Sequence, residues 1–171
     1  MNIVVLVKQV PDSGAERTLN AGDNTVERSS ANNVINEMDE YAIEEALKIK
    51  EAHGGEVTVL TMGPERATES IRKALSMGPD KAVHITDAAL RGSCAVSTSK
   101  VLAAALGTLN ADLVLCGAES TDGRVQAART ARIGDLLDQH DDVHRQTNLR
   151  GCCVDAGTLA RLALIMEVTG R

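Results

Sequence analysis

A short loop of small and polar residues follows the apolar run Leu113 to Cys116. Its members are Gly117, Ser120, Thr121, Asp122 and Gly123, and Arg124 comes directly after them. Glycine lets a backbone approach a ligand closely, and the free N–H groups at the start of a helix favour a phosphate. This composition therefore predicts contact with a nucleotide. The same residue types are also ordinary in turns and helix caps, so that reading stays open.

Two other segments occupy equivalent places in the chain. Lys8 follows the apolar run of residues 2–7, and Met62-Gly63 ends the run of residues 57–62. Ligands of open parallel sheets bind beyond the carboxyl ends of the strands, so these residues belong to the same candidate site. Lys8 could meet a phosphate or simply be solvated. Met62 is expected mainly to pack.

Several better-known chemistries lack their motifs. The sequence has neither the G-x-G-x-x-G fingerprint nor a Walker A lysine motif, which disfavours a standard NAD-binding domain. No Ser/His/Asp or Cys/His constellation is evident, and the histidines show no metal-ligand spacing. His84 stands inside an apolar run and predicts a buried, hydrogen-bonded side chain. We therefore expect no catalytic residues and no metal site.

Composition narrows the class of partner. The chain has 171 residues, a net charge of −6, and Tyr41 as its single aromatic residue. A nucleic acid is an unexpected partner, because phosphate backbones attract basic surfaces and single strands stack on aromatic rings. No run is long enough for a membrane span or a signal peptide. We expect a cytoplasmic protein without membrane insertion and with free cysteines.

The elements that would position the loops alternate along the chain. Buried strands are expected over residues 2–7, 57–62, 82–85 and 113–117. Helices are expected from the N-cap Asn36 to Gly54-Gly55, from Pro64 to Gly78, over 93–107, and more weakly over 124–138. This order predicts an α/β fold: an open parallel sheet with helices on both faces. Residues 17–30 predict a small hairpin inserted after the first strand.

Four segments carry a resemblance to a known family. They are "NIVVLVKQVPD", "EMDEYAIEEALKIKE", "TVLTMGPERATESIRKALSMGPDKAVHI" and "LVLCGAESTDGR". In this order they resemble the β subunit of electron transfer flavoprotein, including its FixA-type relatives. The resemblance covers about residues 1–124 and extends weakly to 138.

The resemblance implies a Rossmann-like, adenine-nucleotide-binding domain. It implies a heterodimer with an α subunit, which holds most of a shared FAD, and a structural AMP in the β subunit. The heterodimer would carry electrons from dehydrogenases to a quinone reductase or another acceptor. Carried over by motif, the nucleotide contacts fall on Leu6, Val7, Lys8, Asn36, Met62, Gly63, Gly117, Ser120, Asp122, Gly123, Arg124 and Val125.

The sequence also departs from the family. The β-branched Val125 stands where the family has a small residue pair beside the phosphate. From Gln139 the resemblance is expected to end, which divides the chain into a domain of residues 1–138 and an atypical tail of residues 139–171. Lysine is absent after Lys100. A C-terminal truncation or a frameshift would explain the tail, and a divergent C-terminus is the alternative.

The tail carries its own structural expectations. Residues 139–150 are too polar to pack well, and "LARLALIM" (159–166) predicts a helix with one apolar face. Without the family's later strands, an edge of the sheet would be left uncovered. Two other functions therefore stay open: a stand-alone nucleotide-binding or regulatory domain, and a non-functional remnant.

Overall fold

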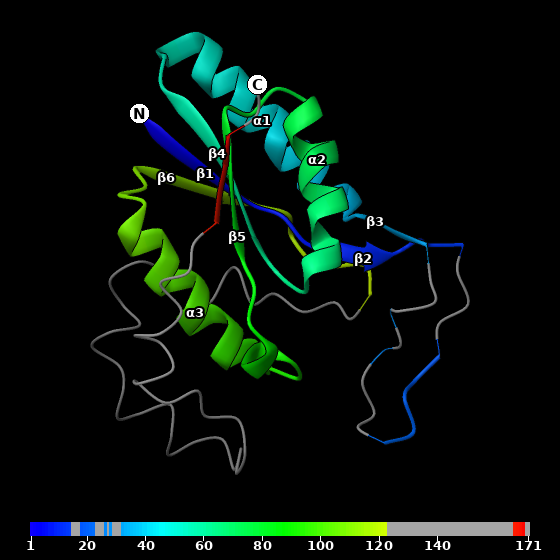
Figure 1. The fold of residues 1–171 in the computed structure, drawn as a ribbon. Coiled ribbons are helices and arrows are strands. Elements are labelled where there is room, and N and C mark those ends of the chain that lie inside the picture. Colours follow the sequence, from blue (N-terminus) through cyan, green and yellow to red (C-terminus); the bar gives the residue numbers. More distant parts are fainter. Residues whose placement is uncertain (15–17, 23–25, 27, 29–31, 123–165, 170–171) are drawn as a thin grey trace.

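A five-stranded sheet forms the centre of the protein (Figure 1). The structure is a computed structural model that describes residues 1–14, 18–22, 26, 28, 32–122 and 166–169. The strand order is β6-β1-β4-β5-β7. The strands are β1 (Asn2–Leu6), β4 (Glu56–Met62), β5 (Lys81–Ile85), β6 (Leu113–Cys116) and β7 (Met166–Thr169).

The first four of these strands run parallel, and β7 pairs antiparallel with β5. The helices that connect the parallel strands are α1 (Glu37–His53), α2 (Thr68–Ser76) and α3 (Ala95–Thr108). Short 3-10 turns, η1 (Glu65–Ala67) and η2 (Ala88–Leu90), precede α2 and α3. The predicted α/β class is confirmed, and each of the four predicted strands and three stronger helices is present.

The two faces of the sheet have separate cores. Ile43 of α1 and Ile71 of α2 pack with Ile3 and Val5 on one face. On the other face, Leu106 and other apolar residues of α3 pack with residues that include Val4, Leu6 and Leu60. Alternate residues of β1 thus point into different cores, which explains why the whole strand is apolar. The helices therefore cover both faces of the sheet, as predicted (Figure 1).

The strand order reverses beside β1. From β1 the chain moves to β4 and then to β5 on one side, whereas β6 returns to the other side of β1. Such a reversal leaves a crevice between the carboxyl ends of two neighbouring strands, where open α/β sheets bind ligands. Here the reversal brings the end of β1, at Leu6, beside the end of β6, at Cys116.

A small excursion separates β1 from α1. Its base is an antiparallel pair of β2 (Gln9–Pro11) and β3 (Asn33–Ile35), and an isolated antiparallel bridge joins Leu19 to Val26. This pairing agrees with the predicted hairpin insertion. Figure 1 shows the excursion lying beyond the end of β1 at which the site described below is formed.

The C-terminal segment differs from the expectation where the structure describes it. Met166 was predicted to end a helix but begins β7, and β7 covers the edge of β5 that was expected to be bare. Short apolar runs do not distinguish helix from strand by periodicity, and the β-branched Val168 and Thr169 favour a strand. The helix expected over 124–138 and residues 139–165 lie outside the described residues. Within the described part, no helix has the length and apolarity to cross a bilayer.

Truncating either core should destabilise the fold to a similar extent. Ile43 is 0% exposed and Leu106 is 1% exposed. We expect Ile43→Ala and Leu106→Ala each to lower the free energy of unfolding by about 2–5 kcal/mol, through lost burial and the remaining cavity. Leu19→Ala is the control, because Leu19 is 65% exposed. Urea denaturation measures all three, and a negligible cost at Leu106 would contradict a second core under α3.

Candidate functional site

Three segments meet at the carboxyl ends of β1 and β6. They are Lys8 after β1, the start of α1 at residues 36–39, and the loop of residues 117–122 after β6. The meeting point is the place where the strand order reverses. Most of the groups that bind the segments together are buried.

Asp39 joins the two strand ends through its carboxylate. Its Oδ2 accepts a hydrogen bond from the Lys8 backbone N–H at 2.8 Å, and its Oδ1 accepts one from the Gly117 backbone N–H at 3.2 Å. Asp39 is 5% exposed. One side chain therefore satisfies two partly buried backbone donors.

The same burial changes the acidity of Asp39. Removal from water raises its pKa from 3.8 to about 6, and the hydrogen bonds from Lys8, Asn36 and Gly117 offset only part of this. An acid in the first turn of a helix ordinarily complements the helix dipole, as Glu37 and Glu40 can do here. Asp39 was not among the predicted site residues, and nothing in its spacing distinguishes it from Glu37 or Glu40.

Gly117 has a packing role that differs from the predicted one. A Cβ at this position would overlap Asp39 Oδ1 and lie 2.8 Å from Met38 Cβ and 2.9 Å from the Met38 carbonyl carbon. Glycine was expected here to let a ligand approach. In the structure it lets the loop approach α1, and its N–H is already bonded to Asp39.

Asn36 stands at the N-cap of α1, as predicted, but its side chain does not cap the helix. Its Nδ2 donates to the Glu119 carbonyl at 3.0 Å, and its Oδ1 accepts from the Thr121 N–H at 3.3 Å. The backbone N–H of Asn36 donates to the Lys8 carbonyl. Asn36 is 1% exposed, so this one residue ties the loop after β6 to the end of β1 from within.

An ion cluster completes the site. Lys8 Nζ donates to Asp122 Oδ1 at 2.7 Å and to Ser120 Oγ at 3.2 Å. Arg28, from the excursion, donates to Asp122 Oδ2 through Nη2 at 2.7 Å and through Nε at 3.2 Å. Burial raises the pKa of Asp122, but the hydrogen bonds from Lys8 and Arg28 outweigh it, so this pKa lies below its usual value.

The predicted residues are only partly brought together. Lys8, Gly117, Ser120 and Asp122 lie together in the site, as their strand-end positions suggested, and Asn36, which the resemblance to the family implied, lies beside them. Gly123, Arg124 and Val125 lie outside the described residues. Arg28 was missed, because a lone arginine in an excursion carries no motif.

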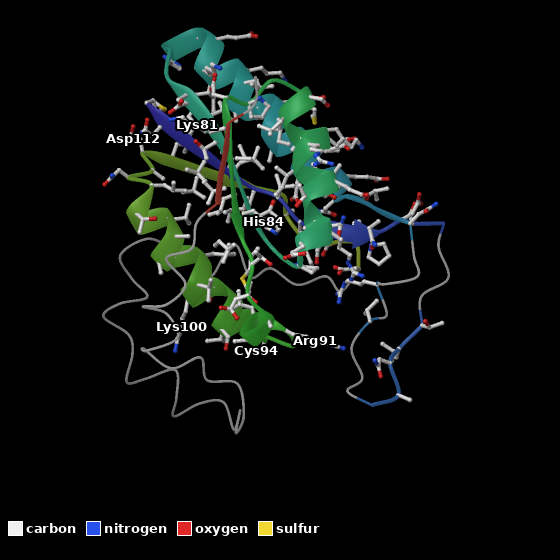
Figure 2. All side chains as sticks on the ribbon, viewed as in Figure 1. Lys81, His84, Arg91, Cys94, Lys100 and Asp112 are labelled. Carbon is white, nitrogen blue, oxygen red and sulfur yellow. The ribbon has the colours of Figure 1, made fainter. Side chains whose placement is uncertain are left out.

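The other predicted residues serve mainly the core. Leu6 and Val7 are each 5% exposed and pack on opposite faces of the sheet. Met62 packs against the core beneath α3, as expected. Gly63 donates its N–H to the Ile85 carbonyl, and its own carbonyl lies 3.1 Å from Nε2 of His84. His84 is thus the buried, hydrogen-bonded histidine that was predicted (Figure 2).

The arrangement suits an anion better than any bond-making chemistry. Two cations, Lys8 and Arg28, lie at the strand ends, where ligands bind in this class of sheet and where they could meet a phosphate. Among the described residues, no group of three or more His, Cys, Asp or Glu side chains is placed to hold a metal ion.

The family model and the individual relatives that match this chain all point to the same protein family. A model of the "Electron transfer flavoprotein domain" matches residues 23–137. An "Electron transfer flavoprotein subunit beta" from Mycobacterium tuberculosis is 49% identical over 164 residues, covering 92% of this chain and 60% of that protein. The protein of the same name from Clostridium acetobutylicum is 38% identical over 159 residues, covering 93% and 59%. "Protein FixA" from Sinorhizobium fredii is 42% identical over 139 residues, covering 78% and 47%.

These matches also bear on the tail. The chain spans about three-fifths of the length of the first two relatives. A match over 92% of the chain must extend past residue 138, because residues 1–138 make up only about four-fifths of it. The expectation that similarity stops altogether at Gln139 is therefore wrong for the mycobacterial relative, although the family model itself ends at residue 137.

Gly117→Ala should destabilise the protein. The added methyl group must displace Asp39 or the Met38 backbone, and overpacking of this kind costs about 1–3 kcal/mol of unfolding free energy. Gly107→Ala is the matched control, because a Cβ there meets no atom within 4 Å and the site lies in α3. Helix propensity should leave this control unchanged or slightly stabilised. Thermal or urea unfolding compares them, and equal stabilities would contradict the close approach at Gly117.

Asp39 should make stability depend on pH. Its folded pKa of about 6 lies above the ordinary 3.8, so the folded state binds a proton before the unfolded chain does and gains stability as the pH falls. Asp39→Asn removes this gain. When the pH is lowered from about 7.5 to about 5, the free energy of unfolding of the wild type should rise by about 1 kcal/mol relative to that of Asp39→Asn. Urea denaturation at both pH values tests this, and a relative fall would contradict the assignment.

Proposed function

The chain belongs to the electron transfer flavoprotein family, and we propose that it acts as the β subunit of a heterodimeric electron transfer flavoprotein. In this role it pairs with an α subunit in the cytoplasm. The pair carries electrons from dehydrogenases to a quinone reductase or another acceptor. The names of the relatives support the subunit type. The donor, the acceptor and the partner are part of the proposal.

One observation carries the nucleotide part of the proposal. Lys8 and Arg28, from segments far apart in the sequence, converge on one side chain at the carboxyl end of the sheet. Cations at this place fit the phosphate of an adenine nucleotide, as the resemblance to the family suggests. We propose AMP as that nucleotide, with a structural role.

The residues of the site bind and orient, and they perform no bond-making step. Asp39 and Asn36 hold the loop of residues 117–122 against α1, while Lys8 and Arg28 supply positive charge. FAD, held mostly by the α subunit, supplies the redox chemistry when bound. The proposal needs no catalytic acid or base from the described part of this chain.

The proposal predicts which molecules accompany the chain. Expressed alone, it should release AMP rather than NAD on denaturation and should show no stoichiometric flavin absorbance. Co-expressed with the α subunit of the same organism, it should purify as a yellow heterodimer. Chromatography of the released nucleotide and the visible spectrum measure these results.

The same experiment separates the alternatives. AMP without capture of the α subunit would favour a stand-alone nucleotide-binding domain. A folded chain that retains no nucleotide and captures no α subunit would favour a non-functional remnant. Stoichiometric flavin in the isolated chain would contradict the division of FAD between the subunits.

A further inference from the structure

The loop of residues 117–122 is attached to the rest of the protein by side chains. Among the hydrogen bonds of the described residues, none joins the loop backbone to the backbone of another segment. The bonds that hold the loop run instead to the side chains of Lys8, Arg28, Asn36 and Asp39. The preceding strand β6, by contrast, is paired with β1 along its whole length. The loop can therefore separate from its neighbours without breaking the sheet.

Two residues at the start of α1 hold the backbone of the loop. Asn36 binds the Glu119 carbonyl and the Thr121 N–H, and Asp39 binds the Gly117 N–H. The bond from Gly117 to Asp39 is 3.2 Å long, whereas the bond from the Lys8 N–H to Asp39 is 2.8 Å long. The longer bond is the one that breaks when the loop leaves. Asp39 then keeps its attachment to the end of β1 and meets water on the other side.

The two attachments differ in their response to pH. The Asn36 amide is neutral at every pH, whereas Asp39 is an acid that is buried by the loop and α1. Burial raises the pKa of Asp39 to about 6, and the bonds and charge of Lys8 lower it only in part. Closure of the loop therefore depends on a group that titrates and on one that does not.

The other charged groups around Asp39 are largely paired. They lie on its own helix, in the loop and in the excursion, and they are Glu37, Glu40, Glu119, Asp122 and Arg28. Glu40 forms an ion pair with Lys73 of α2, and Asp122 forms ion pairs with Lys8 and Arg28. Bonds from Lys8 and Arg28 hold the pKa of Asp122 below its usual value. Asp122 therefore stays ionised over the range in which Asp39 changes its charge.

The sign of the pH effect follows from proton linkage. A carboxylate gains more from contact with water than a protonated carboxyl group does. Opening of the loop hydrates Asp39 and brings its pKa back toward the ordinary 3.8. The closed state thus binds the proton more tightly than the open state. Lowering the pH favours closure, and raising it above about 6 favours opening.

We propose that the loop of residues 117–122 is a gate of the candidate site, that it opens as one unit from α1 and β1, and that ionisation of Asp39 weakens its closure. Asn36 supplies the part of the closure that does not change with pH. Opening uncovers the place where the proposed function puts a nucleotide. That consequence rests on the proposed function, whereas the opening itself is a property of the chain alone.

Amide hydrogen exchange of the full chain, freed of bound nucleotide and followed by NMR, tests the gate. Protection factors, corrected for the intrinsic effect of pH, are compared for Gly117, Thr121 and the buried Val59 of β4. The two loop amides should be less protected than Val59 and insensitive to low urea, because local opening exposes little surface. Their protection should fall about five- to tenfold from about pH 5 to about pH 7.5.

Three variants separate the parts of the proposal. Asp39→Asn should abolish the pH dependence, whereas Glu37→Gln, the matched control at an exposed acid of the same turn, should keep it. Asn36→Ala removes two hydrogen bonds of the loop. It should lower the protection of both loop amides about tenfold at both pH values and keep the pH dependence. This variant also tests the gate if Asp39→Asn does not fold.

Each part can be overturned separately. Loop amides that match Val59 in protection and in urea dependence would overturn the gate. Protection that rises with pH, or a pH dependence that survives in Asp39→Asn, would overturn the role of Asp39. Unchanged protection of Gly117 in Asn36→Ala would overturn opening as one unit. None of these measurements involves a nucleotide or the α subunit, so each failure leaves the proposed function intact.

Discussion

The two hydrogen bonds accepted by Asp39 hold the candidate site together. They run to backbone N–H groups of Lys8 and Gly117, which follow the adjacent parallel strands β1 and β6. The glycine at 117 is required because the loop must come this close to α1. Lys8 uses its backbone for Asp39 and its side chain for Asp122, so the position of the ion cluster also depends on this bridge.

The site contains two buried carboxylates whose pKa values are shifted in opposite directions, and the difference follows from their surroundings. Burial raises the pKa of Asp39, and the hydrogen bonds that it accepts from backbone N–H groups offset only part of this rise. Asp122 receives two formal cations, so its pKa is lowered in spite of burial. As the pH falls, Asp39 takes up its proton first. Asp39 therefore titrates with a pKa of about 6, whereas Asp122 keeps its charge, and with it the ion cluster, to lower pH.

The sequence predicts the framework well because the framework has a simple pattern. β1, β4 and β5 are buried on both faces and read as apolar runs, and glycines mark the ends of the helices between them. The strand-end rule also predicts Lys8 and the loop after β6, whereas Asn36 was named as a site residue only by the resemblance to the family. Asp39 and Arg28 could not be predicted, because their importance arises from the partners that the fold supplies. Met166 was misassigned because a short apolar run fits a helix and a strand equally well.

The antiparallel pairing of β7 with β5 has a consequence for the order of events during synthesis. Residues 81–85 leave the ribosome long before residues 166–169, whereas β1, α1 and β4 are close in sequence and can assemble early. Contacts between distant segments form slowly, because the connecting chain must first be ordered. The nascent chain therefore presents an open strand at β5 for the time needed to translate the residues between β5 and β7. An unpaired edge of this kind is the surface on which chaperones and unwanted strand pairing compete.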